Sequence, residues 1–130
     1  MNGFTAIRTF AATATESAPS AATIYSSGFA RPKQFYSLRF LSQALTLAGS
    51  PTGVNLRVWV VSGGSKTVQT NAQVTLYGTL SATVVGTQAY FNPLDLQQLP
   101  NDAYAYVTVD FVGGTSPTAT GTAFVQPLNQ

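Results

Sequence analysis

Residues 96–114, LQQLPNDAYAYVTVDFVGG, combine a loop, a corner, a long strand and a turn. Within residues 103–111, apolar side chains alternate with tyrosine, threonine and aspartate, which is the period-two pattern of a half-buried strand. Residues 100–102, Pro-Asn-Asp, precede this strand, and the glycines at 113–114 follow it, so turns frame it on both sides. This framing predicts an antiparallel β protein.

The composition is that of a single globular domain with an unusual surface. A chain of 130 residues can bury roughly two thirds of its unfolded surface in one core. It has no cysteine and no histidine, so it lacks disulfides, thiolate nucleophiles, the commonest general base and the commonest zinc ligands. Only 8% of its residues are charged, against about 25% in an average soluble domain. We therefore expect one domain, residues 1–130, with a surface rich in hydroxyl groups.

The charge balance argues against nucleic acid as a partner. Six basic and four acidic residues give a net charge of +2, and nucleic-acid-binding proteins cluster far more base. The densest basic segment, residues 31–33, precedes the aromatic Phe35 and Tyr36, and a solvated loop is the favoured interpretation.

Membrane and export signals are also missing from the sequence. No run approaches the roughly 20 apolar residues of a membrane span. The first residues lack the charged and apolar regions of a secretory signal peptide, so we expect synthesis in the host cytoplasm without one.

Further strands are predicted by the same alternation and by the turn residues between them. They are Phe4–Ala14, Ala22–Phe29, Phe35–Leu47 with a bend near Ser42–Gln43, Val54–Val61, Gln73–Thr79, Ala82–Phe91 and Thr118–Val125. Gly78 and Gly86 are expected at bulges or turns, and Ser62–Ser65 in a hairpin turn. Asn92–Leu99 favours either one helical turn or a connecting loop.

About eight strands without intervening helices predict an all-β fold, an antiparallel β-sandwich that is jelly-roll-like. An immunoglobulin-like sandwich is the alternative. In that alternative, the corner LPNDAY at residues 99–104 is similar to the end of immunoglobulin-like and fibronectin type III domains, where a Leu-Pro segment precedes a tyrosine corner. The resemblance implies a corner role for Tyr104. Counting by twos from Tyr104, however, gives Tyr106, Thr108 and Asp110, so the apolar face has the opposite parity from that family.

The acidic residues do not form an evident catalytic pair. Asp95 and Asp102 lie in loop-like sequence, where carboxylates usually cap backbone N–H groups, so this interpretation is favoured over a calcium site. Asp110 is expected on the exposed face of its strand, paired with an arginine across the sheet. Glu16 has no partner of suitable spacing for hydrolase chemistry, and Lys66 is expected in solvent. We therefore predict no enzymatic activity, no cofactor and no metal.

The aromatic residues suggest binding instead. Trp59 alternates with Val58 and Val60, so it belongs to the less apolar face of its strand, beside Arg57. A surface or interface position and a core position are equally favoured for Trp59. The candidate interface residues are Trp59, Arg57, Arg31 and Lys33.

As a whole, the chain resembles the small β-sandwich decoration or cement proteins of tailed bacteriophage heads. The basis is a compact β domain rich in Thr, Ser, Gly and Ala, without cysteine, histidine or signal sequence, that opens with a strand and ends in a short polar tail. The resemblance implies a place on the capsid surface, contacts with the major capsid protein or other virion proteins, and a homo-oligomer, often a trimer.

We predict a virion structural protein of this kind, a capsid decoration or minor capsid protein, with arms at residues 1–10 and 127–130 that reach neighbours. A carbohydrate-binding or adhesive module is the alternative, with the aromatic residues as a platform for a glycan. A hydrolase that uses Asp95 and Asp102 is a third and weaker hypothesis.

Overall fold

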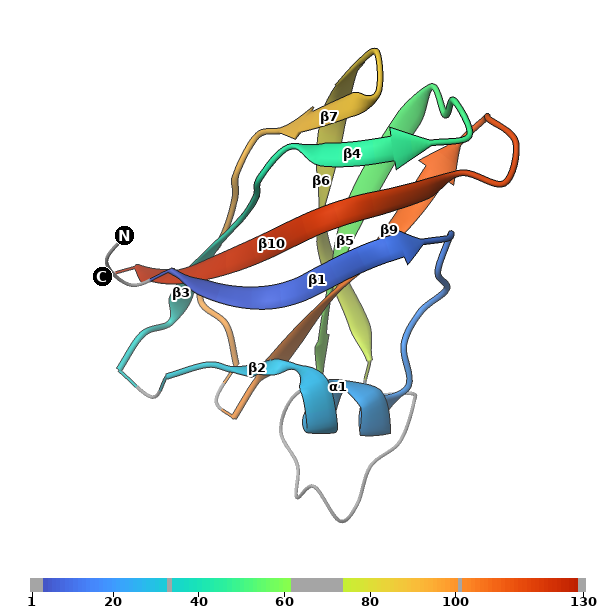
Figure 1. Ribbon diagram of the computed structural model, residues 1–130. Helices are drawn as coiled ribbons and strands as arrows, with labels where there is room; N and C mark the ends of the chain where they lie inside the picture. The colour runs from blue at the N-terminus through green and yellow to red at the C-terminus, as the bar shows by residue number, and fades with distance from the viewer. Residues whose placement is uncertain (1–3, 33, 62–73, 101, 129–130) are drawn as a thin grey trace.

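The computed structural model describes residues 4–32, 34–61, 74–100 and 102–128, and these form an antiparallel β-sandwich with one short helix (Figure 1). In chain order the elements are β1 (Thr5–Thr13), α1 (Ala21–Ser27), β2 (Phe29–Ala30), β3 (Ser37–Ser42), β4 (Leu45–Ala48), β5 (Gly53–Val61), β6 (Thr75–Val85), β7 (Gln88–Phe91), β8 (Leu94–Leu96), β9 (Tyr104–Val112) and β10 (Thr118–Leu128). The predicted all-β sandwich is confirmed.

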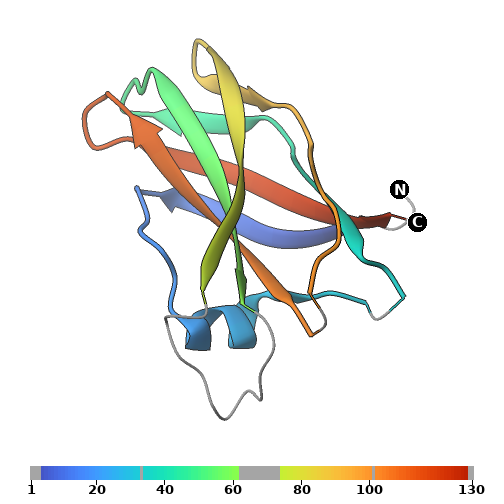
Figure 2. The same ribbon diagram turned by 180° about the vertical axis from the view of Figure 1, so that it is seen from behind.

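The strands form two layers that share β6. The small sheet has the order β2-β9-β5-β6, and β5 and β9 pair along their whole length. Residues 75–81 of β6 pair with β5, whereas residues 82–85 pair with β7 and so enter the second layer. Figure 2 shows β6, β5 and β9 from the outer side of the small sheet.

The large sheet is built around β10. One edge of β10 pairs with β1, and the other pairs with β4 and then with β3. β7 and β8 continue the layer beyond β4 and β3. The last two strands, β9 and β10, thus lie in different layers, whereas the immunoglobulin fold places its last two strands in one sheet. The immunoglobulin-like alternative therefore does not describe this connectivity.

The core lies between the two sheets and follows from the alternation in the sequence. In β5, every second side chain from Val54 to Val60 is at most 1% exposed. Phe10 of β1, Phe40 of β3 and Val109 of β9 meet these residues in one buried cluster. Burying a large apolar side chain contributes about 1.5–3 kcal/mol, so this cluster is the main source of stability.

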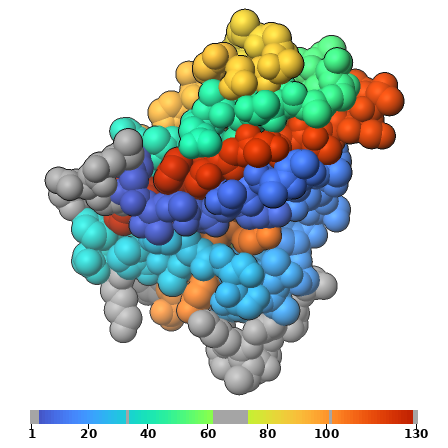
Figure 3. All heavy atoms as spheres, in the orientation of Figure 1, coloured from blue at the N-terminus to red at the C-terminus, as the bar shows by residue number. Residues whose placement is uncertain are grey.

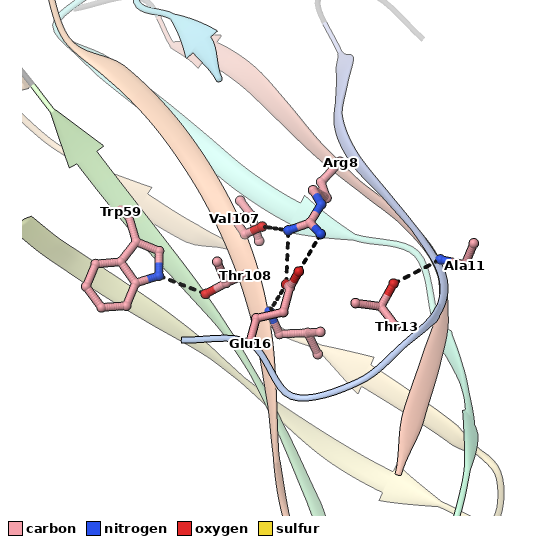
Figure 4. A network of polar contacts seen from close by, with 8 residues as sticks. Arg8, Ala11, Thr13, Glu16, Trp59, Val107 and Thr108 are labelled. Carbon is pink, nitrogen blue, oxygen red and sulfur yellow. Dashed lines mark hydrogen bonds and ion pairs between the residues drawn. The ribbon is translucent and has the colours of Figure 1, made fainter. Parts of the chain in front are cut away.

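A partly buried ion pair closes the sandwich between β1 and β9 (Figure 4). Arg8 donates to both carboxylate oxygens of Glu16, at 3.0 and 2.6 Å, and to the carbonyl oxygen of Val107 at 2.9 Å. The Glu16 backbone N–H donates to the Val109 carbonyl at 2.8 Å, and the Val109 N–H donates back to the Glu16 carboxylate at 3.1 Å. Glu16 therefore binds the edge of β9 as a neighbouring strand would. We call this group, Arg8 and Glu16 on the edge of β9, the seam.

One predicted strand, Ala22–Phe29, is wrong, because residues 21–27 form helix α1. The Ser20 side chain caps the helix by accepting from the Thr23 N–H at 3.1 Å. Ala21, Ile24 and Tyr25 are spaced for one helical face, and all three are buried. The helix ends at Gly28, where a Cβ would lie 2.6 Å from the Ala105 carbonyl oxygen, so only glycine permits this close approach to β9.

The opposite error occurs at Asn92–Leu99, where the structure has a short strand in place of the predicted helical turn or loop. Leu94–Leu96 forms β8 and pairs with β3. Together with β2 and the break near Ser42–Gln43, β8 raises the number of described strands to ten, against the eight expected. The predicted Gly86 turn and the irregularity near Gly78 are confirmed.

The segments predicted to be arms pair within the chain where they are described. Residues 5–10 belong to β1, and Phe10 is fully buried. Residues 127–128 end β10 and pair with β3. The predicted hairpin turn at Ser62–Ser65 and Lys66 lie outside the described residues.

The seam generates the first prediction. Replacing Arg8 with methionine keeps an apolar stem but removes the donors to Glu16 and Val107, and hydrogen bonds to charged groups are worth about 1.5–3 kcal/mol each. We expect Arg8→Met to lower the free energy of unfolding by about 2 kcal/mol in urea denaturation. Arg39→Met, which removes the arginine of an exposed ion pair, is the matched control and should change stability little. Equal losses in the two variants would contradict a special role for the seam.

Candidate functional site

The outer face of the small sheet brings together two of the four predicted interface residues. Trp59 lies opposite Leu76 of β6 on one side and opposite Tyr106 of β9 on the other. In the neighbouring row, Arg57 lies opposite Thr79 and Thr108. We define the tryptophan face as the side chains that point outward from β5, β6 and β9 here: Asn55, Arg57, Trp59, Leu76, Thr108 and Asp110.

Trp59 is fixed in its place by one hydrogen bond and by helix α1. Its indole N–H donates to the Thr108 hydroxyl at 2.7 Å (Figure 4), and Thr108 is only 3% exposed. The ring is partly buried against the cluster that α1 forms with Val61. The sequence favoured a surface position and a core position of Trp59 equally, and the structure combines them. One part of the ring is packed against the α1 cluster, and the other part remains exposed on the tryptophan face.

An apolar side chain continues this surface beside Trp59. Leu76 is 41% exposed and Tyr77 is 37% exposed, although both belong to a strand of the sheet. The register of β6 shifts here, since Trp59 pairs with Leu76 and the preceding Val58 pairs with Gly78. This shift adds an extra residue, Tyr77, to β6 and leaves large side chains on the outside.

The charged residues of the tryptophan face neutralise each other. Arg57 donates to both carboxylate oxygens of Asp110, at 3.2 and 3.0 Å, which confirms the predicted cross-strand arginine partner. The hydrogen bond from Asp110 raises the pKa of the Arg57 guanidinium above its ordinary value. Bidentate pairing holds both side chains against the outer face of the sheet.

Arg31, the third predicted interface residue, is not part of this face. It is only 7% exposed, and its guanidinium donates to the carbonyl oxygens of Pro100 and Phe35 at 2.8 and 2.6 Å. The guanidinium also stacks on the ring of Tyr36, 5.0 Å from its centroid. Arg31 therefore joins the loop between β2 and β3 to the loop before β9 at one end of the sandwich. Lys33, the fourth candidate, lies outside the described residues.

The prediction that Asp95 caps backbone groups is wrong. Asp95 lies in β8 and accepts two hydrogen bonds from Arg39 of β3, at 2.7 and 2.9 Å, on the outer face of the large sheet. Asp102 is exposed and has a left-handed backbone with φ 57°. The two aspartates thus lie in different structural settings, and Asp95 is committed to an arginine. The hydrolase hypothesis gains nothing from this arrangement.

A second feature of the large sheet was not predicted from the sequence. A groove of about 410 Å³ opens on its outer face and is lined by Phe4, Leu41, Ser42, Gln43 and Phe124. Leu41 and Phe124 face each other across β3 and β10. The sequence contained a signal, because Phe124 follows the core residue Ala123 and so must point outward from the sheet.

In the described part of the chain, no three acidic residues gather to hold a metal ion. The one described helix, α1, has seven residues and is too short to cross a membrane. Comparisons with protein-family models, with curated proteins and with solved structures found no match to this chain.

The Arg39–Asp95 pair yields a prediction about pH. The hydrogen bond from Arg39 is the main cause that lowers the pKa of Asp95 below its ordinary value of 3.8. Since the folded pKa is depressed, the pair contributes stability above about pH 4, and this contribution is lost as the pH falls through the folded pKa. We expect NMR titration of the Asp95 carboxyl carbon to give a midpoint below 3.8.

Two variants test whether Arg39 causes the lowered pKa of Asp95. In Arg39→Gln, the Asp95 midpoint should rise toward the ordinary value, because the charged donor is gone. Arg57→Gln removes the arginine of the partly buried pair on the small sheet and should leave Asp95 unchanged. An Asp95 midpoint that stays low in Arg39→Gln would refute the assigned cause.

Proposed function

We propose that the chain is a virion structural protein, a capsid decoration or minor capsid protein, that stabilises a viral shell through protein–protein contacts of its tryptophan face. The observation that supports this proposal most directly is the composition of that face. Leu76 and the open part of Trp59 form an apolar centre, and the Arg57–Asp110 pair with Asn55 forms a polar border. Apolar side chains bordered by polar ones are usual in a protein–protein interface, and Trp and Arg are enriched where binding energy concentrates.

The placement of the acidic residues also favours a structural role. Glu16, Asp95 and Asp110 each form an ion pair with an arginine on another segment of the chain. These carboxylates hold strands and loops together, which is a structural role and not one in acid–base chemistry. Together with the low charge of the chain, this arrangement makes close packing against other proteins electrostatically inexpensive.

The same geometry makes the carbohydrate-binding alternative less favourable. Sugar stacking uses an open aromatic face together with free hydrogen-bonding groups at its border. The Trp59 indole N–H is already donated to Thr108, and its ring is partly covered by the α1 cluster. A flat protein surface can use the remaining exposed edge and Leu76 at once, which a single sugar ring would not.

The proposal is tested by co-sedimentation of the purified protein with shells of the virus that encodes it. Leu76→Glu places a charge in the apolar centre, where it would be desolvated on binding, so we expect affinity to fall about ten-fold or more. Trp59 is the single tryptophan of the chain, so its fluorescence should shift to shorter wavelength when shells bind the wild-type protein.

A matched variant controls for the added charge. Val85→Glu changes an exposed apolar side chain at the other end of β6 from Leu76, and it should bind shells like the wild type. Absence of binding by the wild-type protein, or equal binding by Leu76→Glu, would overturn the proposal. If Leu76→Glu loses both shell binding and the β-sheet circular dichroism signal, the variant has unfolded. In that case, the milder Leu76→Ser is measured in its place.

A further inference from the structure

The outer face of the large sheet has both a recess and a projection. The recess is the apolar groove beside Leu41 and Phe124. The projection is Tyr90 of β7, which is 53% exposed because its neighbours Ala89 and Phe91 point to the core. Figure 3 shows β1, β10, β4 and β7 side by side on this face. A face with both elements can bind a copy of itself.

The distance between the two elements follows from the register. β4 lies between β10 and β7, so Tyr90 is two strand positions from Phe124. Continuing the β10–β4–β7 register places Tyr90 level with Thr122, two residues from Phe124 along the strand direction. With strands about 4.8 Å apart and about 3.3 Å per residue, the two side chains originate about 12 Å apart.

The charges of this face favour a like partner. Among the described residues, the charged side chains on it are Arg39 and Asp95, which bind each other at 2.7 and 2.9 Å. The remaining outward side chains of its central strands are uncharged, among them Thr46, Gln88 and Thr122. Two identical copies of this face therefore meet without net repulsion, whereas a charged partner would find no matching charge.

The size of the face is also suitable. Five strand positions and strands of up to about ten residues give a flat area on the order of 700 Å². A stable interface buries about 800 Å² on each partner, and projecting side chains make the buried accessible area larger than the flat area. A fully buried aromatic side chain removes about 150–250 Å² from water, and Tyr90, which is 53% exposed, can add about half of that on entering the groove.

We infer that two copies of the chain pair through their large sheets, with Tyr90 of each copy in the apolar groove of the other. A two-fold axis that lies in the plane of contact, midway between Tyr90 and the groove, relates the two copies. This axis places Tyr90 of each copy over the groove of the other. Such a contact is reciprocal and closed, so it ends at two copies. This pairing is independent of the proposed shell contact, which uses the opposite sheet.

The inference is tested by complementation between two variants. Tyr90→Ser removes the projection, and Leu41→Lys places a charge in the recess. We expect the wild type to be a dimer in sedimentation equilibrium, and each variant alone to dissociate at least ten-fold more readily. Mixing the two variants should restore a one-to-one dimer, because the intact Tyr90 of the Leu41→Lys copy meets the intact groove of the Tyr90→Ser copy. The second contact of this mixed dimer brings the serine of the Tyr90→Ser copy against the solvated lysine of the Leu41→Lys copy.

The controls distinguish this pairing from other contacts. Tyr77→Ser removes an exposed tyrosine from the small sheet and should leave the dimer unchanged. Trp59 fluorescence in each variant reports that the fold is intact, since Trp59 lies on the other sheet. A monomeric wild type, a wild-type trimer, or a mixture of the variants that stays monomeric would each overturn the reciprocal pairing.

Discussion

Closure of the sandwich along the edge of β9 rests on a partly buried ion pair between Arg8 and Glu16, because this part of the edge would otherwise be unpaired. Exposed strand edges are templates for pairing with other chains. Three groups occupy the edge of β9 in succession. The Arg31 backbone N–H donates to the Ala103 carbonyl oxygen, β2 pairs with the next residues, and Glu16 binds at Val109. The Arg8 guanidinium also lies 4.9 Å from the ring centroids of Phe10 and Tyr106, so the pair joins the core to the outer side of the small sheet.

The same use of charge recurs on each sheet. Arg57–Asp110 joins two strands of the small sheet, and Arg39–Asp95 joins two strands of the large sheet. Each pair neutralises its own charges on the outer face of its sheet, so that the other outward side chains are mainly hydroxyl-bearing or apolar. Exposed pairs add little stability individually. Their greater effect is that both sheets present nearly uncharged faces, which are suited to contacts with protein.

The local sequence pattern predicts the structure correctly where the fold follows that pattern. Alternation in β5 and β9 predicts the core positions, and it placed Asp110 on the face where Arg57 meets it. It failed where tertiary contacts decide. Residues 22–29 are rich in strand formers, but the Ser20 cap and burial of Ile24 select a helix. Asp95 pairs with an arginine 56 positions away, and this partner depends on a register that no local pattern encodes.

The two proposed contacts together restrict how the protein would work. If two large sheets pack face to face, the tryptophan faces of the pair point away from each other, because each lies on the far side of its sandwich. Such a dimer cannot bind one flat surface through both faces. It can join two separate surfaces, such as neighbouring projections of a shell. The second contact then becomes intramolecular, and the gain in avidity is set by effective concentration rather than by new interactions. Dimerisation through Tyr90 would in that case strengthen shell binding without any change in the tryptophan face.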